Sequence, residues 1–442
     1  MNHMRNFKST PHLKPLPLRK ATTVSVLDIG TQKIVCLIAD LQPMREPAQD
    51  RNHSHTARII GIGHQPSAGL KGSIVTSPEA AEQAIRHAVA AAERMARVEV
   101  SSVIVNLSAG RIGSLHTQGQ LTLNQPVRLQ DIDNLHAMAG GSCGHSSRAL
   151  IHSLPIEYRL DGEPHISDPV GMVGSKLGVE MHLVSIDNPV TQNLTMVIER
   201  CWLDVAGFVA SSYASGLATL TDDEMDMGCV LLDIGANSTN IGVFDRGHFV
   251  HADAIAMGGN HITMDIARGL TLRFSVAERL KIMHGSALWD HKDDRNTVPV
   301  PQSPDSYVDT PGYISKGQLS RIIQPRAEEI LEFTKNRLVQ AGFSRHMQQR
   351  IILTGGSSQL NRIDNLSTNI MGGFARIGTP SNIREMPKAA MNPAFATAAG
   401  LLAYPQFAYK ESFEHLNLKN RYAATGTDHY LSRFGRWLKD SF

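Results

Sequence analysis

The stretch CVLLDIGANSTNIGVFDRG, at Cys229–Gly247, decides the fold because it predicts two apolar strands joined by a tight turn. Glycine in such a turn lets a ligand approach the backbone closely. Amide N–H groups and the following hydroxyls can then surround phosphate oxygens. The same pattern occurs in VSVLDIGTQKIVCLIAD at Val24–Asp40, so that LDIG recurs at Leu27–Gly30 and at Leu232–Gly235. One Asp-Ile-Gly is typical of an ordinary hairpin, but two copies in equivalent contexts indicate a duplicated phosphate-binding element.

Two further motifs follow the second turn. RIILTGGSSQL, at Arg350–Leu360, predicts a strand that ends in a glycine pair, where a nucleoside could lie because no side chain blocks it. AERLK, at Ala277–Lys281, places Glu278 and Lys281 three residues apart on one face of a predicted helix. The pair taken alone is equally well explained as a solvated surface contact.

In this order, the two turns, the helix and the glycine strand resemble the actin-like ATPase superfamily. The resemblance implies an α/β, two-lobed actin-like ATPase fold with ATP and Mg²⁺ bound in the cleft between duplicated lobes. Asp28 and Asp233, at strand ends, suit Mg²⁺ held through water. The candidate nucleotide-binding residues are Asp28, Gly30, Thr31, Lys33, Asp233, Gly235, Asn237, Ser238, Thr239, Gly258, Gly259, Asn260, Glu278, Lys281, Gly355, Gly356 and Ser357.

Residues 101–180 differ in character from their surroundings and predict a small α+β subdomain inserted in lobe one. VIVNLSAGRI (Val103–Ile112), LIHSLPIEYRLDG (Leu150–Gly162) and DPVGMVGSKLGVEMHLV (Asp168–Val184) resemble the FtsA family of bacterial cell-division actin homologues. AMGGNHITMDIARGL (Ala256–Leu270) is similar to the same family. The resemblance implies a protein that polymerises on the cytoplasmic face of the inner membrane at the division site. It also implies binding of the FtsZ C-terminal peptide, in the outer part of lobe two, and recruitment of later division proteins.

We therefore expect the following organisation. It comprises a disordered basic arm at 1–21, lobe one at 22–100 and 181–220, the inserted subdomain at 101–180, lobe two at 221–405 with an outer part at about 265–349, a flexible linker at 406–428 and a membrane-targeting helix at 429–442. Within these parts, Ser77 and Pro78 begin a predicted helix that runs to about Arg97. We expect exposed loops at 42–57 and 290–312, an acidic turn at Asp222–Asp226, and a helix at Gln318–Gln340 bent at Pro325.

Hydrolysis in this superfamily needs a polar or acidic side chain that positions water, on a lobe-one segment that corresponds to Ser211–Gly216. That segment is SSYASG and contains no Glu, Asp or Gln. Serine is a poor base, so we predict ATP binding with slow turnover or none, and we assign no catalytic residue.

The C-terminal segment HYLSRFGRWLKDSF, at His429–Phe442, predicts an amphipathic helix with a bulky apolar face opposite a basic face. It is too short to span a bilayer, so we expect it to lie in the surface of an anionic membrane. The residues that we expect to contact lipid are Tyr430, Leu431, Arg433, Phe434, Arg436, Trp437, Leu438 and Lys439. Packing of this helix on the protein itself, or on a partner, is the alternative.

Bulk composition excludes several classes of protein. The formal net charge of +2 gives no case for nucleic-acid binding. The four cysteines form no CxxC pair, which argues against a zinc site or a disulfide framework. No apolar stretch is long enough to span a bilayer, and no secretory signal precedes the first strand. A superfamily sugar kinase and an FtsA-like pilus assembly protein remain the alternative functions.

Overall fold

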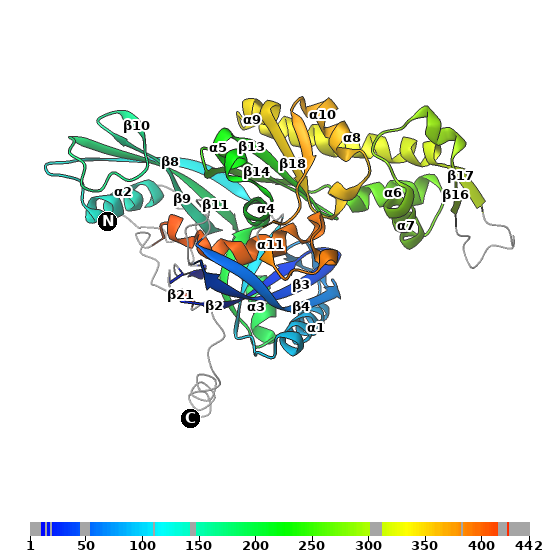
Figure 1. Cartoon of the computed structure of the whole chain (residues 1–442), viewed down its shortest axis with the longest axis horizontal. Coiled ribbons are helices and arrows are strands. Elements are labelled where there is room, and N and C mark those ends of the chain that lie inside the picture. The colour runs from blue at the N-terminus through cyan, green and yellow to red at the C-terminus, as the bar shows by residue number, and fades with distance from the viewer. Residues whose placement is uncertain are drawn as a thin grey trace. The chain divides into compact units, whose positions relative to one another are not determined.

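The structure is a computed structural model of the chain, and it describes residues 10–13, 16–17, 20–44, 54–108, 111–141, 147–300, 312–381, 383–413 and 422–423. The described residues form two compact units (Figure 1). The first comprises those within Met1–Ala210, Asn382–Pro387 and Ala398–Phe442, and the second comprises Ser211–Ser381 and Lys388–Thr397. No described helix is long and apolar enough to cross a membrane.

A six-stranded mixed sheet forms the centre of the first unit, in the order β12-β7-β2-β3-β4-β20. Its strands are β2 (Thr22–Ile29), β3 (Lys33–Pro43), β4 (His55–Pro66), β7 (Ser102–Leu107), β12 (Asp204–Ala210) and β20 (Ile383–Arg384). Helix α1 (Pro78–Ala96) packs on β3 and β4, and α3 (Asn188–Arg200) packs beside α1. A Cβ atom at Gly63 of β4 would lie 1.7 Å from the carbonyl oxygen of Ala88, so glycine is what allows α1 to pack this closely.

Three local expectations in this unit need correction. Ser77 is the N-cap of α1 by position, but its side chain makes no capping hydrogen bond. Both ends of the expected loop at 42–57 are strand, because β3 extends to Pro43 and β4 begins at the buried residue His55. Strand β7, which we expected in the inserted subdomain, pairs in parallel with β2 and β12 in the large sheet.

The inserted subdomain has one helix on one face of a four-stranded antiparallel sheet, in the order β10-β9-β11-β8. Its elements are β8 (Gly113–Thr122), α2 (Leu129–Gly141), β9 (Arg148–Leu160), β10 (Glu163–Ile166) and β11 (Lys176–Asp187). Alternate residues of β11, among them Leu177, Val179 and Met181, are buried together with Leu135 and Ala139 of α2. The period of two predicts this one-sided burial, and the module has its own small core.

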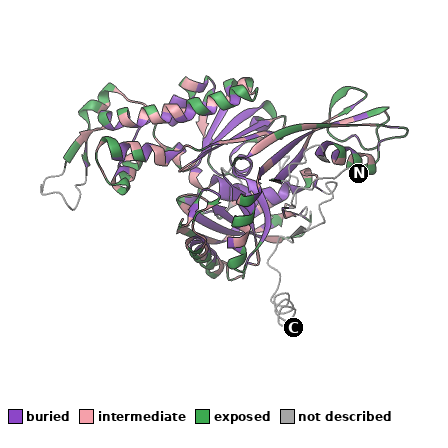
Figure 2. Cartoon of the chain, turned by 180° about the vertical axis from the view of Figure 1, so that it is seen from behind, coloured by how far each residue is buried: buried purple, intermediate pink, exposed green. Residues whose placement is uncertain are grey.

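The second unit has a five-stranded sheet in the order β15-β14-β13-β18-β19. Its strands are β13 (Cys229–Ile234), β14 (Thr239–Asp245), β15 (His248–Ile255), β18 (Arg350–Thr354) and β19 (Phe374–Ile377). Helices α4 (Ser211–Thr219), α5 (Asp222–Met227), α9 (Ser344–Gln349) and α10 (Ile363–Met371) contact these strands. The central strands and α4 are buried, whereas α10 has both buried and exposed positions (Figure 2).

The sequence leads us to expect α5 as a turn, and the structure shows why it is helical. Thr221 accepts a hydrogen bond from the Glu224 amide, while the Glu224 carboxylate accepts one from the Thr221 amide. This capping box supplies partners for two of the donors that a helix N-terminus leaves unpaired. We placed the end of lobe one at 220, whereas the second unit begins at Ser211 and so includes α4.

The outer part of the second unit contains α6 (Gly259–Gly269), α7 (Phe274–His284) and the long helix α8 (Lys316–Gln340). Pro325 lies inside α8. Within the expected loop at 290–312, a short 3₁₀ helix (His291–Arg295) precedes β16 (Thr297–Val300), which pairs with β17 (Gly312–Ser315). Alternation at TVPV buries Val298 and Val300, a pattern that the prolines obscure.

Both terminal segments contain residues that pack, contrary to the expected arm and linker. In the arm, β1 (His12–Leu13) pairs with β21 (Tyr422–Ala423). After α11 (Ala396–Ala403), the chain continues against the first unit to Phe413, which joins the core of the inserted subdomain. The expected linker therefore starts too early at 406. The expected membrane helix at 429–442 lies outside the described residues.

A buried carboxylate fastens this C-terminal segment. Glu411 accepts hydrogen bonds from His152 Nδ1, at 2.8 Å, and from the Tyr404 hydroxyl, at 2.9 Å. His152 Nε2 accepts the Ala210 amide at 3.0 Å, so the ring is neutral and its proton is on Nδ1. Strand β9 of the inserted subdomain, the end of β12 and the C-terminal segment thus meet at one residue.

Glu411→Ala should lower the free energy of unfolding by about 2 kcal/mol, because two buried donors lose a charged acceptor. Urea unfolding at pH 7 measures the change. Tyr409→Ala is the matched control, since Tyr409 is two residues away and 62% exposed. Equal denaturation midpoints for Glu411→Ala and the parent would show that the segment is not held by this contact.

Candidate functional site

The two Asp-Ile-Gly turns have the same backbone geometry. In the first, the Gly30 amide donates to the Lys33 carbonyl at 2.9 Å; in the second, the Gly235 amide donates to the Ser238 carbonyl at 2.9 Å. A Cβ atom at either glycine would lie 3.0 Å from that same carbonyl oxygen. The repeat in the sequence is therefore a repeat in structure, with one turn in each unit.

Asp233, at the end of β13, is 6% exposed and held in one orientation. The Ser215 hydroxyl and the Thr397 hydroxyl each donate to Asp233 Oδ2, both at 3.1 Å. Ser215 comes from α4 and Thr397 from the start of α11, so two helices fix the carboxylate. Nothing in the Asp-Ile-Gly pattern indicates either partner.

The glycine pair lies beside Asp233 because β18 runs parallel to β13, with Asp233 in register with Thr354. Gly355 has φ of 84°, and a Cβ atom there would lie 2.3 Å from Asp233 Oδ1. The chain itself therefore requires glycine at 355, which corrects our explanation based on a nucleoside alone. At Gly356 the nearest atom to an added Cβ is Ala394 Cβ, at 3.8 Å, so Gly356 is the position with space beside it.

The first residues of α6 pack directly on the second turn. The Gly259 amide donates to the Gly235 carbonyl at 3.0 Å, and the Asn260 amide donates to the Ala236 carbonyl at 2.7 Å. A Cβ atom at Gly258 would lie 2.5 Å from the Gly235 carbonyl oxygen. These amides therefore hold the turn against α6, which is a structural role that we did not predict for them.

The side chains around the second turn are also largely engaged within the protein. Thr239 donates to the Met257 carbonyl at 2.9 Å, and Ser357 donates to the Gly235 carbonyl at 2.9 Å. Asn260 Nδ2 donates to Asn237 Oδ1 at 2.8 Å. Asn237, Thr239, Asn260 and Ser357 are thus each hydrogen-bonded within this unit.

Glu278 and Lys281 are not a solvated surface pair. Their side chains are 20% and 10% exposed and lie 2.8 Å apart. Lys281 Nζ also donates to the Gly259 carbonyl, at 3.0 Å, and to Thr263 Oγ1, at 2.8 Å. Burial lowers the pKa of Lys281 below its ordinary value, although Glu278 acts in the opposite direction. The pair therefore connects α7 to the first turn of α6, which begins at Gly259.

The first turn is supported differently, by residues of the first unit. Asn106, at the end of β7, accepts the Ile29 amide through Oδ1 at 2.7 Å, and the Thr31 hydroxyl accepts the Gly72 amide at 2.9 Å. Asp28 is 7% exposed. Partial burial and the charge of Lys33 lower the pKa of His64. Asn106 is the supporting residue that sequence reasoning missed; a polar residue in an otherwise apolar strand was its only signal.

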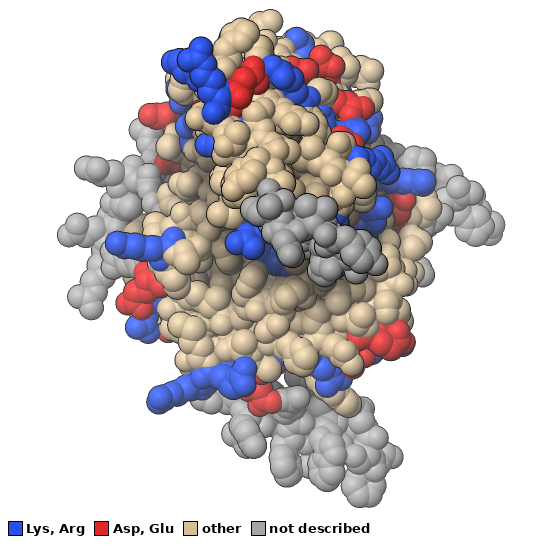
Figure 3. Space-filling model, turned by 90° about the vertical axis from the view of Figure 1, so that its right-hand side faces the viewer, with Lys and Arg blue, Asp and Glu red and all other residues tan. Residues whose placement is uncertain are grey.

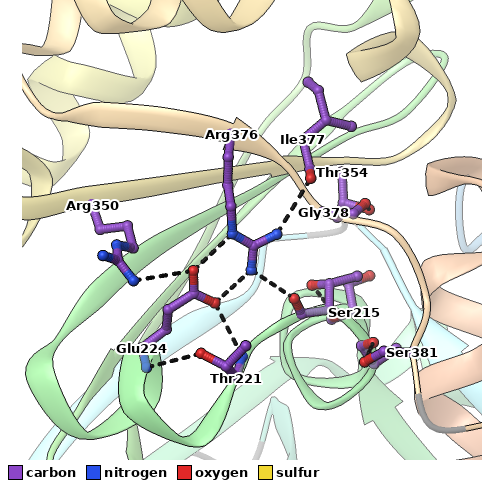
Figure 4. A network of polar contacts seen from close by, with 11 residues as sticks. Ser215, Thr221, Glu224, Arg350, Thr354, Arg376, Ile377, Gly378 and Ser381 are labelled. Atoms are coloured by element: carbon purple, nitrogen blue, oxygen red, sulfur yellow. Dashed lines mark hydrogen bonds and ion pairs between the residues drawn. The ribbon is translucent and has the colours of Figure 1, made fainter.

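An ion-pair network around the buried carboxylate of Glu224 stabilises the helix that carries Ser215 (Figure 4). Glu224 accepts from Arg376 Nε at 2.7 Å, and Arg376 Nη2 donates to the Thr219 carbonyl at 2.9 Å. Arg350 lies 3.4 Å from the same carboxylate. Burial by itself raises the pKa of Glu224, but the hydrogen bonds from Arg376 and the Thr221 amide, with both arginine charges, bring it below its ordinary value. Thr219 in turn donates to the Ser215 carbonyl at 2.7 Å.

The segment Ser211–Gly216 forms the start of α4, and all of its residues are buried. It contains no carboxylate, and the Ser215 hydroxyl is bonded to Asp233. A Cβ atom at Gly216 would lie 2.2 Å from the ring of Phe244, so this end of α4 packs tightly on β14.

Comparison with known proteins identifies the family. A family model described as cell division protein FtsA matches residues 230–400, and one described as an SHS2 domain inserted in FtsA matches residues 109–185. The cell division protein FtsA of Rhizobium meliloti (strain 1021) is 43% identical over 433 residues, which are 98% of each chain. The chain belongs to the FtsA family of cell division proteins. The Escherichia coli K12 FtsA is 29% identical over 94% of this chain and 97% of its own.

Solved structures show that this FtsA has the actin-like ATPase fold. The chain is similar to the PilM-PilN type IV pilus biogenesis complex, with a TM-score of 0.59 and 16% identity over 88% of this chain and 98% of that one. It is similar to MreB5 of Spiroplasma citri bound to ADP, with a TM-score of 0.52 and 14% identity over 89% and 98% of the two chains. At these identities the likeness concerns the fold alone, so the FtsA relatives decide against the pilus-protein and sugar-kinase alternatives.

Glu224→Gln should lower the free energy of unfolding of this FtsA by about 2 kcal/mol at pH 7, because two arginines lose their charged partner. The pKa of Glu224 is lower in the folded state, so its contribution is present above the unfolded value and is lost as the pH falls through the folded one. The difference from the parent should therefore stay constant from pH 7 down to the ordinary glutamate pKa of 4.5, and shrink only below it, in urea unfolding. Glu332→Gln, at an exposed position of α8, is the control. A pH-independent difference would contradict the ion-pair explanation.

Proposed function

We propose that this FtsA binds ATP with Mg²⁺ through the residues of its two Asp-Ile-Gly turns and of the glycine strand. The observation that carries the proposal is the duplicated turn, in which Gly30 and Gly235 make the same hydrogen bond. Each turn leaves a glycine beside a carboxylate at a strand end, which suits a phosphate chain together with its cation. MreB5 of Spiroplasma citri, which shares the fold, is described as bound to ADP.

Within this proposal the residues have four roles. Asp28 and Asp233 hold the cation through water, since Mg²⁺ keeps several waters and prefers oxygen ligands. Thr31, Lys33 and Ser238 contribute to phosphate binding, whereas Gly356 supports the nucleoside. Asn237, Thr239, Gly258, Gly259, Asn260, Glu278, Lys281, Gly355 and Ser357 hold the backbone of the turns in place, as their hydrogen bonds and packing indicate. Turnover is slow, because α4 offers no acid to position water.

Asp233→Ala and Gly356→Val should each weaken ATP binding more than tenfold, or at least about 1.4 kcal/mol. The first removes the carboxylate at the turn, and the second places a side chain where the structure leaves space. Fluorescent-ATP titration measures the affinity, and urea unfolding checks that each variant folds. Gly312→Val, at a glycine where an added Cβ atom would meet no atom within 4 Å, is the matched control outside the proposed site. Unchanged affinity in both variants would show that ATP does not bind at these residues.

The division role that we propose follows the family. This FtsA anchors FtsZ filaments through the FtsZ C-terminal peptide, polymerises and recruits later division proteins. We place the peptide on the outer part of the second unit, at about 265–349. Several large apolar side chains are exposed there, on α7, β17 and α8: Phe274, Ile282, Met283, Tyr313 and Phe333. Contiguous exposed apolar patches are typical of protein-binding surfaces, and we propose that these side chains contribute to one. Lys and Arg are mixed with Asp and Glu on the face in Figure 3, as the net charge of +2 leads us to expect.

We propose further that the segment at 429–442 binds the inner membrane as an amphipathic helix. Its apolar positions, led by Phe434, Trp437 and Leu438, would be buried among the lipid headgroups. Each basic residue near an anionic surface contributes about 1 kcal/mol. One helix of this length binds weakly and reversibly, so stable attachment requires many copies acting together in a polymer.

Trp437→Glu should release the protein from anionic liposomes, because it places a charge in the middle of the apolar face. The same variant should keep its affinity for ATP and for an FtsZ C-terminal peptide, which we place on other parts of the chain. Liposome co-sedimentation measures the loss, and Arg433→Gln with Arg436→Gln and Lys439→Gln should weaken binding chiefly to anionic vesicles. A Trp437→Glu protein that pellets as the parent does would show that another segment is the anchor.

A further inference from the structure

The two edges of the sheet in the inserted subdomain are built differently. At one edge, β10 (Glu163–Ile166) has only four residues, contains Pro164 and a carboxylate, and pairs irregularly with β9. Short length, proline, charge and a bulge are the features by which proteins protect an exposed edge from pairing with other chains. This edge is therefore protected.

The opposite edge has none of these features. Strand β8 (Gly113–Thr122) is ten residues long, and its sequence, GSLHTQGQLT, contains no proline and no Asp, Glu, Lys or Arg. Its pairing with β11 runs without a bulge from Gly113 opposite Ser185 to Thr122 opposite Lys176. Among the described strands none pairs with its other side. A long, regular and uncharged edge is a template for a further strand.

The two faces of β8 determine what such a strand must offer. Odd-numbered residues face α2 and the core: a Cβ atom at Gly119 would lie 2.8 Å from the Leu135 carbonyl oxygen, and Leu121 packs against the core. Leu115 is on the same side but is 48% exposed. Even-numbered residues, including Gln118 and Gln120, are polar and exposed. The incoming strand needs apolar residues at alternate positions on the α2 side and uncharged polar residues on the other.

We propose that β8 pairs with β8 of a second copy of this chain, in antiparallel orientation about a two-fold axis at Gln118. A continuous sheet requires odd residues to face odd residues, since a shift by one residue reverses the faces. With Gln118 opposite its own copy, Leu115 lies opposite Leu121 and Thr117 opposite Gly119. The exposed Leu115 is then covered by an apolar partner, and no like charges meet along the seam.

Self-complementarity favours a second copy over an extended segment of another protein. The strand already carries the alternation that its own edge requires, and the absence of charge removes the repulsion that would otherwise oppose pairing of identical strands. The contact is isologous, so it joins two copies and then closes. It is therefore separate from the polymerisation proposed above and does not depend on ATP or on the membrane.

Oxidative cross-linking of the full-length chain, without nucleotide or lipid, tests both the contact and its register. In Gln118→Cys the two introduced thiols face each other across the axis, at a Cβ separation that side chains in opposed strands bring within reach of a disulfide. In Gln120→Cys, on the same exposed face, the thiols are four residues apart along the seam, about 13 Å. A disulfide-linked dimer is expected for the first variant and not for the second, and the parent with its four cysteines gives the background.

A charge test complements the cross-link. Gln118→Lys alone and Gln118→Glu alone should each dissociate the dimer in analytical ultracentrifugation, while an equimolar mixture should restore it, because opposite charges then meet at the axis. Gln118 is exposed, so these changes leave the fold intact. Absence of a dimer for Gln118→Cys, equal cross-linking at 118 and 120, or failure of the mixture to restore the dimer would each overturn the proposal. Loss of ATP-dependent polymerisation without any change in the cross-link would concern the proposed function instead.

Discussion

Parallel pairing of β13 with β18 is the constraint on which the second unit depends. It places Asp233 in register with Thr354, so the next residue, Gly355, lies directly beside the buried Asp233 carboxylate. Only a residue without a side chain fits there, and Gly355 also adopts a φ of 84° that other residues rarely tolerate. The glycine strand and the second Asp-Ile-Gly turn thus form one structural unit, because the aspartate of the turn requires the glycine of the strand.

A chain of hydrogen bonds connects more distant elements to the glycine strand and the second turn. Arg376 joins the Glu224 carboxylate to the Thr219 carbonyl, Thr219 bonds the preceding turn of α4, and Ser215 of that turn bonds Asp233. Lys281 plays the same supporting role between α6 and α7, because its ammonium group donates to three acceptors. A buried charge is costly unless it is paired. The Glu224 carboxylate and the Lys281 ammonium group are both paired, and their partners help to position the turn.

The inserted subdomain is attached to its unit by more than its two chain connections. His152 of β9 links the Ala210 amide to Glu411, and Phe413 enters the subdomain core from the C-terminal side. The base of the module is therefore fixed by the segment that leads toward the C-terminus, while its far strand β8 presents an unprotected edge. A small sheet that is fixed at one side and open at the other is suited to contact other molecules.

Some properties of this FtsA follow from local sequence because their physics is local. The Asp-Ile-Gly turns, the alternation in β11 and the apolar strands of both sheets depend on residues close together in the chain, and their positions could be predicted. The Thr221–Glu224 capping box is equally local and was available as a signal for α5. The resemblance to the actin-like superfamily could be recognised from the order of the motifs along the chain.

What only the tertiary structure decided are contacts between residues far apart in sequence. Asn106 at the first turn, Thr397 at Asp233 and Glu411 at His152 have partners 77, 164 and 259 positions away. Strand β7 could not be assigned to the large sheet from its own residues, because a buried strand has the same apolar pattern in either sheet. Our reason for glycine at 355 was incomplete. The atom that excludes a side chain there belongs to a strand more than a hundred residues earlier, and only the folded chain brings the two together.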